Sequence, residues 1–316
     1  MLASTVVPPA PIRAEADGLT PYPGARRPDR RRTVDRGGIA LCVWEWGDED
    51  APPILFAHGG FDFAGTYDTL APLVADQGWR VVSWDQRGHG DSQHGHLYSW
   101  DADLRDAAAV LDSTSDGAIP ILGHSKGGAL MLQLADALPH RVSHVVNLDG
   151  LPSARSWPDV PDHHRTRLLN GELAGWLDHR RVAADKIRRP GTIEELAERR
   201  GRMNPRMDPD WLRYLVPIGA YEEADGWRWK IDASMRMGGF GPWRPEWSMS
   251  RLPSLGMPVL CVLGLDIEVM GWGTLPEDVV PNLPAGARFV PLDGVGHFVH
   301  IEKPAVVADL TLELIS

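Results

Sequence analysis

Short and almost wholly apolar runs recur along the first half of the chain, each of β-strand length. The runs occupy residues 39–47, 52–60, 79–88, 118–124 and 142–150. Segments of helix length separate the later runs, at residues 62–77, 101–113 and 126–138. Apolar strands that alternate with helices are typical of a parallel sheet covered on both faces. The pattern therefore predicts an α/β fold.

This alternation stops after Asp149. Residues 152–248 are polar and rich in arginine, contain seven of the 13 tryptophans, and are predicted to be helical. Within them, 192–200 reads as a helix, because a threonine and two glutamates precede a basic end. The strand pattern returns at 257–264 and 287–296 and is followed by a helix at 303–314.

These features predict one α/β domain that is interrupted by a helical cap. The first 30 residues are rich in proline and arginine and are expected to be a flexible lead-in, with the arginines of 26–32 as part of a tail. The predicted units are the lead-in at 1–30, the first part of the core at 31–151, the cap at 152–248 and the second part of the core at 249–316.

Composition and charge exclude several classes of partner. The 316 residues carry a net charge of −11, so the chain lacks the positive field that nucleic acid or an anionic membrane attracts. No run reaches the roughly 18 apolar residues of a membrane span, and the first residues do not read as a signal peptide. Cys42 and Cys261 lie in apolar runs and are expected to be reduced. We expect a soluble cytoplasmic protein with no nucleic-acid or membrane partner; its oligomeric state stays open.

A single serine stands between glycines where one predicted strand meets a helix. The segment reads ILGHSKGG, with Gly123 and Gly127 each two positions from Ser125. A sharp strand-to-helix turn strains its middle residue, and side chains two positions away would collide with the neighbouring strand and helix. The helix N-terminus also supplies positive potential and amide donors for an oxyanion. Ser125 is therefore the predicted nucleophile.

The serine hydroxyl needs a base to take its proton. Among 12 histidines the best candidate is His297, which lies in GVGHFVHIEKP between the last predicted strand and the final helix. A short loop there can bring the imidazole over Ser125, and the order nucleophile, acid, histidine fits this architecture. His300 is the neighbour to exclude and is expected to pack or cap. The side chain of His124 is expected to point away from Ser125.

The expected oxyanion donors are backbone amides. One is the amide of Lys126, directly after the serine. The other comes from the turn after ILFAHGG, where Gly60 or Phe61 can offer an N–H. The ammonium of Lys126 is expected to be solvated, and His58 is expected to brace the turn by hydrogen bonds.

Four motifs, AHGG, DQRGHGDS, GHSKGG and GVGHFVHIEKP, resemble those of the α/β-hydrolase superfamily in their order and spacing. The resemblance covers residues 33–150 and 250–316 and is nearest to the cap-bearing serine esterase and lactonase branch. It implies an eight-stranded, mostly parallel sheet, a lid made from the insertion and a structural turn at 85–92. Dehalogenases and epoxide hydrolases of the superfamily use an aspartate nucleophile, so Ser125 argues against both activities.

The acid departs from the family pattern, and its identity stays open. Relatives often carry Gly-x-x-Asp after the strand that matches 257–264, but here Asp266 is one position early and Glu268 one position late. Asp149, at the end of an earlier strand, is a position that some cap-bearing relatives use. The acid must accept a hydrogen bond from Nδ1 of His297. Asp266 is the first candidate, Asp149 the alternative and Glu268 the third.

The leading prediction is a serine hydrolase that cleaves a small or medium apolar ester or lactone through an acyl-enzyme intermediate. Ser125 would attack, His297 would act as the base, and Asp266 or Asp149 would orient it. Two alternatives keep this triad and act as a carbon–carbon bond hydrolase or a perhydrolase. A third is a non-catalytic ligand receptor on the same fold.

Two weaker signals remain. His89, His94 and His96 have a spacing that could suit a metal, but they lie in a glycine-rich turn that is expected at the surface or at the rim of the site. Trp272 follows the acid loop and is a candidate for contact with the substrate. Because a serine mechanism needs no metal, we predict neither a metal nor a cofactor.

Overall fold

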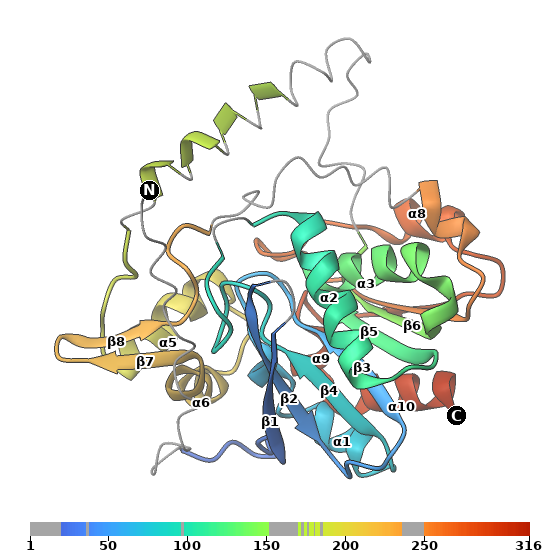
Figure 1. The fold of residues 1–316 in the computed structure, drawn as a ribbon, viewed down its shortest axis with the longest axis horizontal. Coiled ribbons are helices and arrows are strands. Elements are labelled where there is room, and N and C mark those ends of the chain that lie inside the picture. Colours follow the sequence, from blue (N-terminus) through green and yellow to red (C-terminus); the bar gives the residue numbers. More distant parts are fainter. Residues whose placement is uncertain are drawn as a thin grey trace.

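A computed structural model describes residues 20–35, 38–95, 98–151, 186–235 and 250–316, with shorter stretches between 170 and 183. At its centre is an eight-stranded sheet in the order β1-β2-β4-β3-β5-β6-β9-β10 (Figure 1). The strands are β1 (Arg30–Asp35), β2 (Ala40–Trp46), β3 (Pro53–Ala57), β4 (Arg80–Trp84), β5 (Ile119–His124), β6 (Val142–Leu148), β9 (Val259–Gly264) and β10 (Arg288–Leu292). β2 is antiparallel to β1 and β4, and the other neighbours pair in parallel. The predicted mostly parallel sheet is confirmed.

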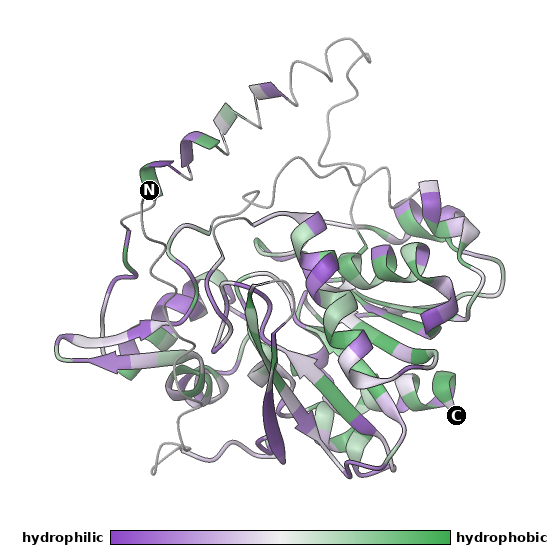
Figure 2. Ribbon diagram, in the orientation of Figure 1, coloured by the Kyte–Doolittle hydropathy of each residue, from purple (hydrophilic) through white to green (hydrophobic). Residues whose placement is uncertain are grey.

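Helices cover both faces of this sheet. α1 (Ala71–Ala75) and α10 (Pro304–Ile315) belong to one hydrophobic core, while α2 (Trp100–Thr114), α3 (Lys126–Ala137) and α8 (Pro276–Val279) belong to the other. The shorter helices are η1 (Ala64–Tyr67), η2 (Pro139–Arg141), η4 (Leu252–Ser254), η5 (Val280–Asn282) and α9 (Val299–Glu302). In β3, Phe56 faces the first core and Leu55 the second, because successive side chains of a strand point to opposite faces. Both faces are therefore buried, which explains the hydrophobic central strands in Figure 2.

The chain between β6 and β9 forms elements outside the main sheet. They are α5 (Ile193–Met203), α6 (Pro209–Gly219) and a hairpin of β7 (Ala220–Glu223) and β8 (Gly226–Trp229). Thr192 caps α5, as its sequence predicts, and Glu195 completes a capping box. The hairpin was not expected in a helical segment. Residues 152–169 and 236–249 of the predicted cap lie outside the described residues, so its boundaries stay a prediction.

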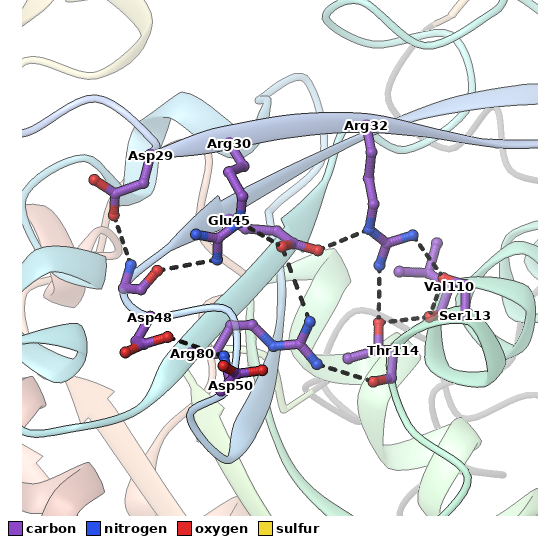
Figure 3. A network of polar contacts seen from close by, with 11 residues as sticks. Asp29, Arg30, Arg32, Glu45, Asp48, Asp50, Arg80, Val110, Ser113 and Thr114 are labelled. Atoms are coloured by element: carbon purple, nitrogen blue, oxygen red, sulfur yellow. Dashed lines mark hydrogen bonds and ion pairs between the residues drawn. The ribbon is translucent and has the colours of Figure 1, made fainter.

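The arginines near the N-terminus form a strand of the sheet, so their prediction as a tail is wrong. Two of them, Arg30 and Arg32, surround Glu45, a buried residue of β2, together with Arg80 of β4 (Figure 3). Nε of Arg32 lies 2.7 Å and Nε of Arg30 3.4 Å from this carboxylate, and Nη1 of Arg80 on β4 lies 4.0 Å away. The buried charge on the neighbouring strand thus anchors β1 to the edge of the sheet.

None of the described helices has both the length and the apolar character that crossing a membrane requires.

Candidate active site

Ser125 occupies the sharp turn between β5 and α3 with a strained backbone. Its φ of 52° and ψ of −123° lie in a region that residues other than glycine rarely adopt. A Cβ added to Gly123 would lie 2.3 Å from the carbonyl oxygen of Gly127, and one added to Gly127 would lie 2.1 Å from that of Ala57. No side chain fits at either position. The structure therefore shows the steric reason for both glycines that the sequence predicted.

His297 lies in the loop between β10 and α9, close to the end of β5. Its carbonyl oxygen accepts a hydrogen bond from Nε2 of His124 at 2.9 Å, and the two rings are 4.8 Å apart. His124 thus binds the backbone of this loop through its side chain. Burial lowers the pKa of His124 well below the usual value. His300 is fully buried and packs 4.3 Å from the ring of His124, as predicted for a packing residue. Its burial lowers its pKa to about 3.

The structure brings Asp149 to His297. Oδ1 of Asp149 lies 3.3 Å from Nδ1 of His297, and both side chains are buried. Oδ2 of Asp149 accepts a hydrogen bond from the amide of Gly264, at the end of β9. The Asp149 contact is at ion-pair distance, although its angle does not meet that of a hydrogen bond. Such pairs are often poorly aligned before the substrate binds and tighten in the complex.

Asp266, the first candidate for the acid, points elsewhere. Its Oδ2 lies 2.8 Å from Nη1 of Arg206, and its side chain is 42% exposed. The same guanidinium also binds Glu302 at 2.9 Å. The shift of one position from the usual Gly-x-x-Asp spacing turns this carboxylate to a surface ion pair. Asp266 is therefore replaced by Asp149 as the carboxylate next to His297.

Glu268, the third candidate, binds the backbone of His297, whereas Asp149 lies next to its imidazole. Its Oε2 accepts a hydrogen bond from the His297 amide at 2.6 Å. Burial raises the pKa of this carboxyl group, and the amide of His297 opposes that rise. Glu268 thus fixes the position of the loop that carries the histidine.

Of the expected oxyanion donors, the structure contradicts Phe61 and leaves Gly60 and Lys126. The amide of Phe61 donates to Nε2 of His89 at 3.2 Å, so the assignment of Phe61 as a donor is contradicted. For Gly60, no acceptor of its amide is found in the part of the chain that the structure describes. Lys126 is the first residue of α3, as the turn requires. Gly60 and Lys126 remain the candidate pair.

His89 is fully buried, so its expected place at the surface is wrong. Its Nε2 accepts from Phe61 and its Nδ1 lies 3.0 Å from the carbonyl oxygen of Arg87, so hydrogen bonds occupy both nitrogens. Nε2 of His94 lies 3.0 Å from the carbonyl oxygen of Lys230, and its side chain is exposed. His96 lies outside the described residues.

Trp272 touches the candidate nucleophile directly. Its indole Nε1 donates to Oγ of Ser125 at 3.2 Å. The sequence marked Trp272 only as a candidate for substrate contact, since nothing in its neighbours indicates which atom it reaches. An indole N–H is a donor only, so this contact orients a lone pair of the hydroxyl oxygen.

Comparisons with known proteins agree with this fold. The chain matches the family model described as "alpha/beta hydrolase fold" over residues 52–173. The thioesterase domain from the curacin biosynthetic pathway has a TM-score of 0.77 at 24% identity, with 90% of this chain and 99% of that chain covered. The chain belongs to the α/β-hydrolase superfamily.

Two relatives in this superfamily extend the likeness beyond the fold. A serine hydrolase-like protein from Danio rerio is 26% identical over 281 residues, which are 85% of this chain and 83% of the relative. The sn-1-specific diacylglycerol lipase ABHD11 from Danio rerio is 30% identical over 216 residues, which are 62% of this chain and 66% of the relative. The chain is thus a serine hydrolase-like α/β hydrolase.

Proposed function

We propose that this chain is a serine hydrolase that cleaves small or medium apolar esters or lactones through an acyl-enzyme intermediate. The observation that carries the proposal is the position of Ser125, on a strained turn, at the same edge of the sheet as the buried pair of His297 and Asp149. All three residues follow strands β5, β6 and β10, whose carboxyl ends share one edge of the sheet. In open α/β sheets, this edge is where ligands bind.

The proposed reaction uses the hydroxyl of Ser125 as the nucleophile. As Oγ attacks the carbonyl carbon, His297 takes the hydroxyl proton and Asp149 stabilises the imidazolium. The amides of Gly60 and Lys126 would bind the negative oxygen of the tetrahedral intermediate. Its collapse transfers the proton from His297 to the leaving alkoxide. Water, deprotonated by the same imidazole, then releases the acid and restores Ser125.

The apolar character of the substrate is inferred from what surrounds the nucleophile. The indole of Trp272 lies against Ser125, and the ring of Phe298 packs 5.2 Å from that of His297. Aromatic walls of this kind favour an apolar acyl or alcohol group. We further propose that residues 152–248 form a cap over this site.

The test is a panel of p-nitrophenyl esters, lactones and amides assayed with the wild type and with Ser125→Ala. We expect ester or lactone hydrolysis by the wild type and a loss of about 10⁶-fold in kcat for the variant. A fluorophosphonate should label the wild type and leave Ser125→Ala unlabelled. Hydrolysis that survives in Ser125→Ala, or a folded wild type that the fluorophosphonate does not label, would refute the proposal.

A further inference from the structure

The ammonium of Lys126, expected in solvent, is buried behind the proposed nucleophile. Nζ lies 2.7 Å from Oδ2 of Asp103 on α2, where the angle makes the contact an ion pair only. It donates a hydrogen bond to Oε1 of Gln86 at 2.6 Å. The side chains of Lys126 and Asp103 are 5% and 2% exposed. A buried lysine requires such partners, because an unpaired charge in the interior is strongly destabilising.

Gln86 continues this chain of contacts to the turn after β3. Its Nε2 donates to the carbonyl oxygen of His58 at 2.5 Å, and its backbone amide donates to Nε2 of the same histidine at 2.9 Å. Both the main chain and the ring of His58 are therefore held by one residue. Gln86 itself is 1% exposed, so water does not compete for these bonds.

The tautomer of His58 follows from these contacts. Since Nε2 accepts from the Gln86 amide, the proton of the neutral ring is on Nδ1. That N–H donates to the carbonyl oxygen of Gly59 at 2.7 Å. Burial lowers the pKa of His58 to about 3, so the ring stays neutral near pH 7.

The carbonyl of Gly59 and the amide of Gly60 belong to one peptide unit. Because that unit is planar and trans, the bond from His58 to the Gly59 oxygen also sets the direction of the Gly60 N–H. The unit lies next to the nucleophile, since a Cβ added to Gly59 would be 3.3 Å from Cβ of Ser125. The far end of the chain of contacts is Lys126, whose own amide is the other proposed donor.

We propose that Lys126, Gln86 and His58 are positioning residues that hold the two oxyanion donors, the amides of Gly60 and Lys126, in a fixed mutual geometry. The inference rests on the proposed serine-hydrolase function. Tetrahedral oxyanions require donors placed within tenths of an ångström, and a displacement of about 1 Å can lower the rate about 10²-fold. These side chains link the two turns that supply the donors. In the described residues no backbone hydrogen bond joins the two turns, although Gly127 packs against the carbonyl oxygens of Ala57 and His58.

The central test is Gln86→Glu, which preserves the size of the side chain. A carboxylate still accepts from Lys126, but it cannot donate to the carbonyl oxygen of His58 and repels it, so this link is the one that is broken. Lys126→Met instead removes the ammonium group that binds Gln86. Both variants are assayed with a p-nitrophenyl ester for kcat and KM and with an alkyl boronic acid, whose tetrahedral adduct resembles the intermediate.

The control is Asp106→Asn, at the other end of the same buried charge network. Asp106 binds Nε and Nη2 of Arg87 at 2.6 Å each, and Arg87 lies 3.9 Å from Asp103. This variant loses a buried charge pair without touching Gln86 or His58. It should lower the melting temperature and leave kcat within about threefold of the wild type.

We expect Gln86→Glu to lower kcat by about 10²-fold, to weaken boronic acid binding by a similar factor and to change KM by less than about threefold. A folded Gln86→Glu with wild-type kcat and boronic acid affinity would overturn the inference while Ser125→Ala remains inactive. Equal losses of kcat in Asp106→Asn would also overturn it, since the effect would then be general destabilisation. A wild type that neither hydrolyses esters nor reacts with fluorophosphonate would instead refute the proposed function.

Discussion

Four histidines are buried in the folded chain and kept neutral there. His58, His89, His124 and His300 are at most 1% exposed, and burial lowers the pKa of each, to about 3 for His58 and His300. In the unfolded chain, each would titrate near its ordinary value of about 6.5. Below that pH these four residues bind more protons in the unfolded state than in the folded state, so their contribution to stability falls as the pH falls from about 6.5 towards 3.

The size of this effect follows from the two pKa values. Between about pH 7.5 and pH 5, one histidine with a folded pKa of about 3 lowers the free energy of unfolding by about 2 kcal/mol. His58 and His300 together give about 4 kcal/mol, and His89 and His124 act in the same direction. Since domains are stable by about 5–15 kcal/mol, we expect marked loss of stability by pH 5.

The variant that isolates one of these groups is His300→Leu. In the described residues, neither ring nitrogen of His300 has a hydrogen-bond partner, so the substitution removes a proton site without breaking such a bond. The free energy of unfolding is measured by urea unfolding and circular dichroism at pH 7.5 and at pH 5. From the higher to the lower pH, it should fall by about 2 kcal/mol less in His300→Leu than in the wild type. Val307→Ala, in the core and without a titratable group, should lower stability equally at both pH values. If His300→Leu keeps the wild-type drop, the reasoning is refuted.

Three further predictions concern the site. Asp149→Asn should lower kcat about 10⁴-fold with the fold intact, whereas Asp266→Asn should stay within a few-fold; comparable losses in kinetic assays would contradict the assignment. Gly127→Ala should destabilise by about 3 kcal/mol or more, because the new Cβ would lie 2.1 Å from a carbonyl oxygen, and a melting temperature near that of the wild type would argue against this. Trp272→Phe removes the N–H that binds Ser125 and should lower kcat/KM about 2- to 10-fold, measured on the same ester; an unchanged value would show that the contact is idle.

Most of the sheet could be predicted because buried strands leave a local signal. The apolar run at 118–124 became β5 at Ile119–His124, and the run at 142–150 became β6 at Val142–Leu148. β1 was missed because its first three residues are arginines, which read as a solvated tail. Their partner Glu45 lies on another strand, and no local pattern reveals a buried carboxylate so far away in the sequence.

The site shows the same division between local and non-local information. The glycines around Ser125 are required by steric contacts at one turn, so the sequence was enough to predict that turn. The acid depends on how strands pair: β6 lies beside β9, and this places Asp149 against the amide of Gly264 and near His297. Likewise, the burial of Lys126 depends on Asp103, which α2 supplies from 23 positions earlier. Spacing alone could not decide either contact.

Backbone strain supplies an independent argument that this edge of the sheet is the functional one. Outside the glycines, the described residues contain three with positive φ: Phe61 at 61°, Ser125 at 52° and Asp149 at 46°. They follow β3, β5 and β6, which are adjacent in the sheet, so the strain is confined to one place. Such conformations are unfavourable by about 1–3 kcal/mol each and persist only where the surroundings enforce them. A fold selected for stability alone would relax them, whereas a site that must hold a nucleophilic hydroxyl, and a carboxylate beside its histidine, has a reason to keep the strain at Ser125 and Asp149. Phe61 lies directly after Gly60, in the turn of the proposed oxyanion donor.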